Sequence, residues 1–253
     1  MSTHRPSNNF LALSLLTMAL SANAMAETTQ QKSWTTAAEL GAITTSGNTK
    51  GTSVTGKIDS KQELEHWSNE YVLSAYFKED EQTDNNGVKR SEKSAERYFV
   101  SGKGGYKLDQ DNATLFVFGS YTDDAFGAYT KYSLVSLGYG DRLYQDDNKT
   151  LDAEIGPGYF SGRTSDDRTE NGLMLRSAAN FNWAFSDTAA FKQTLSVEVG
   201  SDNTRTAAES SISAKLNGKM QMKAAFLVQN DSDVPLGKKK TDTQTSLTLV
   251  YAF

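Results

Sequence analysis

Apolar and polar residues alternate with a period of two along most of the chain. Between residues 173 and 185, for example, Leu173, Leu175 and Phe181 lie on one side of the pattern, and Arg176 and Asn180 lie on the other. A period of two places successive side chains on opposite faces of a β-strand. The pattern predicts twelve strands, at residues 33–44, 51–60, 66–78, 95–108, 112–122, 130–143, 150–160, 172–185, 189–200, 207–216, 219–229 and 242–253.

The predicted strands suit a membrane better than a soluble core. They are about 10–14 residues long, whereas strands of globular proteins usually have about 5–6 and tilted membrane strands need about 9–11. Gly102, Gly104 and Gly119 fall on the apolar face, where they would leave holes in a packed core but not against lipid. The pattern favours an all-β fold, a transmembrane antiparallel up-and-down β-barrel of twelve strands, over a soluble β-sandwich.

The connections between strands predict an orientation. Long polar connections at residues 78–94, 161–171 and 230–241 follow odd-numbered strands, and short ones such as residues 186–188 follow even-numbered strands. Long loops outside and short turns inside are typical of outer-membrane barrels, so we expect both termini to be periplasmic. The same orientation places five aromatic residues at the periplasmic membrane interface, namely Trp34, Trp67, Trp183, Tyr251 and Phe253.

The first residues have a different pattern. Arg5 precedes an apolar run at residues 10–20, which is followed by the small residues of 22–26. This order is typical of a secretory signal peptide. We expect residues 1–26 to be cleaved and residues 27–253 to form one barrel domain in the outer membrane of a Gram-negative bacterium.

Composition excludes several classes of function. The chain has 26 basic and 31 acidic residues, so it lacks the basic excess of a nucleic-acid-binding protein. It has no cysteine, which excludes disulfides, thiolate metal sites and cysteine nucleophiles. We expect a monomer without a cofactor or a metal.

The stretch AAELGAITTSGNTKGTSVTGKID, with Gly47-Asn48 in a hairpin between two strands, resembles a family of outer-membrane proteins. The resemblance extends more weakly over most of the mature chain to LTLVYAF. The family consists of salt-induced outer membrane proteins of the YdiY type, whose function is unknown. The resemblance implies an envelope location and an association with salt stress, and it implies no reaction and no site residues.

Enzymatic chemistry has little support in the sequence. His66 is the only histidine after the signal peptide, and Ser68 follows two positions later on the same face of the predicted strand. A histidine–serine pair of a hydrolase requires hydrogen-bond contact, and His66 is placed at the end of a strand. We therefore expect no catalytic site, and an outer-membrane hydrolase based on His66 is a distant third alternative.

Function is expected in the lumen of the barrel. The inward positions carry charges of both signs in nearly equal numbers: Glu39, Lys57, Asp59, Glu70, Arg97, Lys103, Asp152, Glu154, Arg176, Lys192, Glu198, Glu209, Lys215 and Lys223. These groups either line a narrow passive channel for small solutes or ions, or pair across the bore of a structural envelope protein with an occluded lumen. Twelve strands lie between filled and wide barrels, so size does not decide.

Two partners are predicted besides the outer-membrane lipid. Lys238, Lys239 and Lys240 precede the last strand on the outer side, where they would meet lipopolysaccharide phosphates. Retention of lipopolysaccharide after removal of the three lysines would disprove this contact. The last strand, which ends at Phe253, resembles the signal that the barrel-assembly machinery reads.

Overall fold

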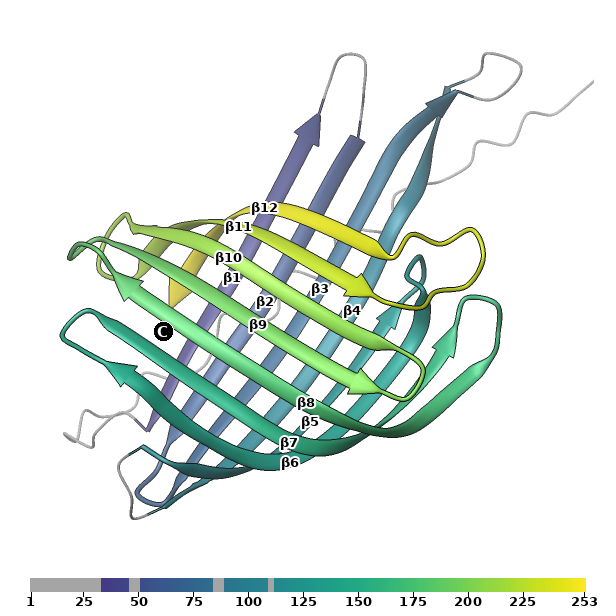
Figure 1. Cartoon of the computed structure of the whole chain (residues 1–253). Helices are drawn as coiled ribbons and strands as arrows, with labels where there is room; N and C mark the ends of the chain where they lie inside the picture. Colours follow the sequence, from purple (N-terminus) through teal and green to yellow (C-terminus); the bar gives the residue numbers. More distant parts are fainter. Residues whose placement is uncertain (1–32, 46–50, 84–88, 109–111) are drawn as a thin grey trace, which may run out of the picture. The chain divides into compact units, whose positions relative to one another are not determined.

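The computed structural model describes residues 33–45, 51–83, 89–108 and 112–253. Twelve antiparallel strands form one closed barrel in which each strand pairs with its neighbours in sequence and β1 pairs with β12 (Figure 1). The predicted twelve-stranded antiparallel barrel is confirmed. The predicted signal peptide, residues 1–26, lies outside the described residues.

The strand boundaries are as follows. The strands are β1 (Trp34–Thr45), β2 (Gly51–Glu63), β3 (Trp67–Thr83), β4 (Lys89–Lys107), β5 (Thr114–Asp124), β6 (Tyr129–Gln145), β7 (Lys149–Thr164), β8 (Thr169–Ala184), β9 (Ala189–Gly200), β10 (Thr204–Lys215), β11 (Met220–Asp231) and β12 (Thr241–Ala252). Among the described residues, no helix is long and apolar enough to cross a membrane.

The two faces of the sheet carry different side chains. Leu173 and Leu175 are 78% and 46% exposed on the outside of β8, whereas Arg176 is 8% exposed and points into the barrel. An apolar outer surface is stable where lipid covers it, and the polar residues are left to line the interior. The alternation in the sequence therefore becomes the difference between the outside and the inside of the barrel.

Several strands are longer than predicted. β3 and β4 continue to Thr83 and from Lys89, through most of the segment expected to be a long loop (Figure 1). β7 and β8 likewise leave only residues 165–168 as the connection between them. The predicted loops 78–94 and 161–171 were therefore wrong in length. Where a strand extends beyond the apolar band, both faces are polar and the period-two pattern disappears.

The β7–β8 turn is held by its own side chains. The hydroxyl of Thr164 donates to the carboxylate of Asp166 at 2.5 Å, and Nε of Arg168 donates to the same carboxylate at 2.8 Å. These two donors hold the pKa of Asp166 below its usual value. The adjacent Asp167 has a φ of 65°, in the left-handed region that tight turns use.

Strands β6 and β7 approach each other closely at two glycines. A Cβ atom added to Gly138 would lie 2.2 Å from the carbonyl oxygen of Ile155, and one added to Gly156 would lie 2.0 Å from that of Leu137. Neither position has room for a side chain. The close approach adjoins Pro157, which has no N–H to donate to the neighbouring strand.

A small apolar cluster lies inside the barrel, at the end where β5 connects to β6 and β7 connects to β8. Its buried members are Ala128, Tyr129, Tyr132, Leu134, Phe160 and Met174, and Phe118 and Val234 pack against them. Val234 belongs to the β11–β12 connection, residues 232–240, which also contacts the β5–β6 connection because Nζ of Lys238 donates to the carbonyl of Phe126 at 2.9 Å. The cluster and this loop together cover part of the barrel mouth.

Candidate functional site

The lumen contains two adjoining cavities. The first has a volume of about 900 Å³ and reaches the end of the barrel where the connections after even-numbered strands lie; His66 and Asn112 are in its lining. The second has a volume of about 440 Å³, lies deeper in the barrel, and is lined by residues of all twelve strands. Five residues line both cavities and mark the boundary between the two: Glu70, Val72, Lys103, Glu154 and Asn180.

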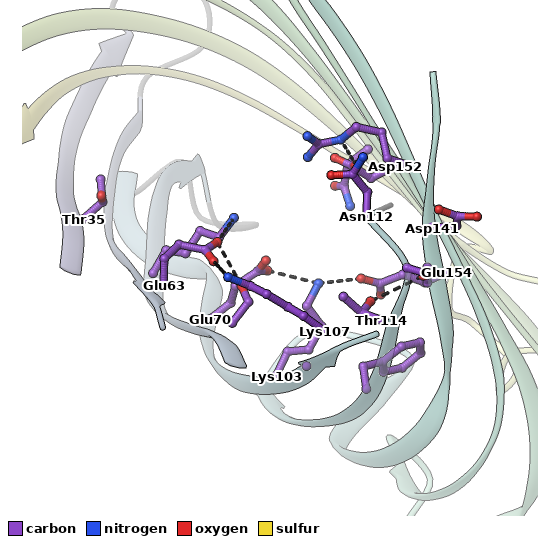
Figure 2. Close-up of a pocket in the computed structure, with 18 of the residues that line it drawn as sticks. Thr35, Glu63, Glu70, Lys103, Lys107, Asn112, Thr114, Asp141, Asp152 and Glu154 are labelled. Atoms are coloured by element: carbon purple, nitrogen blue, oxygen red, sulfur yellow. Dashed lines mark hydrogen bonds and ion pairs between the residues drawn. The ribbon is translucent and has the colours of Figure 1, made fainter. Parts of the chain in front are cut away.

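A lysine and two carboxylates form this boundary. Nζ of Lys103 lies 2.5 Å from Glu154 and 3.2 Å from Glu70, and Figure 2 shows it between the two. Arg176 adds a second, longer contact to Glu154 at 3.4 Å. β4 and β7 are not neighbours in the sheet, so the contact between Lys103 and Glu154 crosses the interior of the barrel. We name Glu70, Lys103 and Glu154 the constriction.

A second lysine is paired in the same way. Nζ of Lys223 on β11 lies 3.2 Å from Glu39 on β1 and 3.1 Å from Glu209 on β10. These side chains line the deeper cavity. Paired carboxylates satisfy a partly buried ammonium, whose isolated burial would be costly.

Three arginines of the deeper cavity are held differently. Each guanidinium lies over an aromatic ring: Arg97 at 5.9 Å from Tyr76, Arg176 at 4.2 Å from Phe118, and Arg205 at 4.5 Å from Tyr132. Arg97 on β4 donates to Gln244 on β12, across the lumen. Stacking on a ring fixes the plane of a guanidinium and leaves its edge free for hydrogen bonds.

The structure places thirteen of the fourteen predicted lumen charges in the linings of the two cavities. The exception is Lys215, which lies at the end of β10 and donates to the carbonyl of Asp187 at 2.9 Å. Because β10 ends at Lys215, its side chain reaches the adjacent turn and lines neither of the two cavities.

Arg205 and the tyrosines of β6 were not predicted as lumen residues. Arg205 precedes the predicted strand 207–216, because Thr204 and Thr206 do not show the apolar alternation. Tyr132 was not predicted because it shares the inner face of β6 with the apolar Leu134, so this face lacks the charges that mark the lumen elsewhere. Its hydroxyl donates to Glu198 of β9 at 2.8 Å. No pattern within one strand signals a contact that joins two distant strands.

The five aromatic residues predicted for the membrane interface lie at one end of the barrel, the end where the connections after even-numbered strands lie. Trp34 stacks on Tyr71 with centroids 6.1 Å apart, and Trp67 packs edge-on against Tyr106 at 5.4 Å. The other three, Trp183, Tyr251 and Phe253, are 38%, 39% and 57% exposed. That this belt lies at a membrane interface stays a prediction.

His66 does not form a hydrolase-like site. The hydroxyl of Ser68 donates to Glu63 at 3.0 Å, and Nε2 of His66 lies 3.8 Å from the highly exposed Glu65. Within the described part of the chain, no group of three or more histidine or acidic side chains is placed to hold a metal.

Two of the three lysines of the β11–β12 connection donate hydrogen bonds to backbone carbonyls. Nζ of Lys240 donates to the carbonyl of Ser232 at 2.6 Å, and Lys238 is bound to Phe126 as described above. Lys239 is exposed. The predicted contact of these lysines with lipopolysaccharide stays a prediction.

Solved structures show where this fold occurs. An outer membrane channel of Pseudomonas putida F1, COG4313, is similar with a TM-score of 0.51 and 13% identity, over 87% of this chain and 95% of that chain. The translocator domain of the autotransporter NalP from Neisseria meningitidis matches with a TM-score of 0.48 and 15% identity, over 89% of each chain. The NanC porin matches with a TM-score of 0.49 and 8% identity, over 85% of this chain and 98% of that chain. The first of these supports the barrel fold and, at this identity, the fold alone.

The sequence comparisons identify a family. No curated protein is a significant sequence match to the chain. A family described as a protein of unknown function, DUF481, matches residues 38–253, which include nearly all of the barrel. The chain therefore belongs to the DUF481 family.

Proposed function

We propose that this protein is an outer-membrane barrel that forms a narrow passive channel for ions and small solutes. The observation that carries the proposal is the boundary between the two cavities. The wide cavity and the deeper one share five residues, and three of these, Glu70, Lys103 and Glu154, are ion-paired side chains that stand between the two spaces.

Side chains, unlike backbone, can move aside on the timescale of solute passage. The side chains of Lys103 and Glu154 are 17% and 12% exposed, so the pair is largely buried but borders both cavities. The constriction is therefore a place where a small solute can displace a side chain without unfolding a strand.

A structural envelope protein with an occluded lumen is the second candidate. Contacts across the lumen favour it, because Arg97 binds Gln244 and Tyr132 binds Glu198 between strands that are not neighbours. The apolar cluster and residues 232–240 also cover part of one mouth. This candidate makes the opposite prediction for conductance.

The proposed setting is the outer membrane, reached after cleavage of the predicted signal peptide, with the strand that ends at Phe253 as the part that the assembly machinery reads. The family resemblance supports an association with salt or osmotic stress. A channel with a narrow, charged constriction suits such a role, because its selectivity depends on ionic strength. Measurement of the protein level across external salt concentrations tests this association.

The experiment is single-channel recording of the refolded barrel in a planar bilayer under a salt gradient. We expect unitary steps in the wild-type protein and a reversal potential that shifts toward anion selectivity in Glu154→Gln, because this change leaves Lys103 with one carboxylate instead of two. Glu92→Gln is the matched control, since its side chain is exposed on β4 and lines neither cavity. A folded, heat-modifiable barrel without steps would rule out the channel and support the occluded lumen.

A further inference from the structure

Among the described residues, two of the three buried side-chain polar atoms without a hydrogen-bond partner belong to arginines of the deeper cavity. They are Nε of Arg176 and Nη1 of Arg205, and the third is Oγ of Ser136. A buried donor without a partner costs free energy, and native proteins usually satisfy such donors with a bound group or water. These donors therefore indicate where a ligand with acceptor oxygens would bind.

The partners of the two arginines leave them incompletely neutralised. Arg176 contacts Glu154 at 3.4 Å, but Glu154 is held more closely by Lys103 at 2.5 Å. The guanidinium of Arg205 lies 3.9 Å from Asp231, and its Nε and Nη2 face the side-chain amide of Gln229. Lys103 and Lys223, in contrast, each have two carboxylates within 3.2 Å.

One carboxylate lies between the two arginines in the sheet. Glu198 on β9 is in register with Arg176 on β8 and with Arg205 on β10. Its Oε2 accepts a hydrogen bond from the hydroxyl of Tyr132 at 2.8 Å, which directs it to β6. One negative charge therefore lies between two guanidinium groups and balances only one of the two positive charges.

The guanidinium planes are also held in place before any ligand binds. Arg176 lies over Phe118 and Arg205 lies over Tyr132, and both side chains are largely buried. A guanidinium presents its donors as a planar fork that matches the two oxygens of a carboxylate or phosphate. Because stacking limits its rotation, little conformational entropy is lost on binding.

We infer that the deeper cavity binds a small anionic solute, carrying a carboxylate or phosphate group, through Arg176 and Arg205. Both arginines line this cavity. The inference rests on the proposed function, since a solute reaches this cavity through the lumen. It names the class of solute that the channel would prefer.

Isothermal titration calorimetry of the full barrel in detergent, at low ionic strength, tests the site without requiring conduction. The probes are succinate, inorganic phosphate and, as the uncharged control, succinamide. We expect succinate or phosphate to bind, succinamide not to bind, and Arg176→Gln and Arg205→Gln to weaken anion binding about tenfold or more, as for loss of a charged hydrogen bond. Lys215→Gln, which removes a positive charge outside the cavities, should leave the affinity unchanged.

Binding by one anion alone identifies the chemical group that the site prefers. Failure of both anions to bind, or equal binding by all variants, would overturn the inference and mean that water satisfies the two donors. If a glutamine variant does not give a heat-modifiable band, Arg205→Lys keeps the charge without the fork and should also weaken binding. A barrel that binds anions but shows no conductance would disprove the channel and leave the site intact.

Discussion

At the scale of single residues, the position of one side chain on β8 decides whether it meets lipid or lumen. Leu175 is 46% exposed on the outer surface, and its neighbour Arg176 is 8% exposed inside. A charge on the lipid-facing side costs about 2–4 kcal/mol near the middle of the bilayer. The sequence pattern was sufficient to assign these faces, because that cost excludes the opposite assignment.

A reciprocal pair of substitutions tests this assignment. We expect Leu175→Arg to lower the free energy of unfolding in lipid by about 2–4 kcal/mol and to impair insertion. Arg176→Leu should still insert, since Glu154 keeps its contact with Lys103. Folding into lipid vesicles, followed by the heat-modifiable shift on a gel, measures both. Normal insertion of Leu175→Arg would show that this face of β8 does not contact lipid.

At the scale of elements, the shape of the barrel depends on how closely neighbouring strands approach. Gly138 on β6 and Gly156 on β7 lie where neither strand has room for a Cβ atom.

Between β1 and β12 the register covers four residue pairs, from Ala37 with Ala252 to Leu40 with Leu249. The register of β2 with β3, in contrast, covers every residue of β2. The barrel is therefore closed by its shortest strand pairing, that of β1 with β12.

Gly138→Val tests the close approach of β6 and β7. The added side chain would collide with the backbone carbonyl of Ile155, which cannot rotate away, so we expect destabilisation of roughly 1–3 kcal/mol. Gly102→Ala is the control, because its Cβ would lie at an ordinary 3.8 Å from Tyr71. Urea unfolding of both variants in vesicles measures the difference. Equal stability would mean that β6 and β7 are farther apart than described.

At the scale of the whole molecule, residues 232–240 bring distant parts of the chain together at one mouth of the barrel. Val234 packs against the apolar cluster, and Lys238 is bound to the β5–β6 connection. The contact of Lys238 with Phe126 joins residues more than a hundred positions apart in sequence. Ser232 and Asp233 are also hydrogen-bonded to Asn203 in the β9–β10 connection.

Shortening this loop by residues 234–239 is expected to increase single-channel conductance, because it uncovers the mouth above the apolar cluster. Lys239→Gln is the matched control, since Lys239 is exposed and its loss leaves the packing of Val234 in place. Conductance of the two variants in the same bilayer is the measurement. Unchanged conductance in the shortened barrel would place the limiting resistance at the constriction instead.

The sequence alone determined the fold class, the number of strands and the face of almost every lumen charge. These properties follow from the cost of placing charge in lipid, which acts on each strand separately and leaves a period-two pattern. Only the tertiary structure decided which charges meet. Arg97 and Gln244 are 147 residues apart in sequence, and Tyr132 and Glu198 are 66 apart. Such contacts depend on the curvature of the closed sheet and the stagger of its strands, so no single strand encodes the constriction or the two unsatisfied arginines.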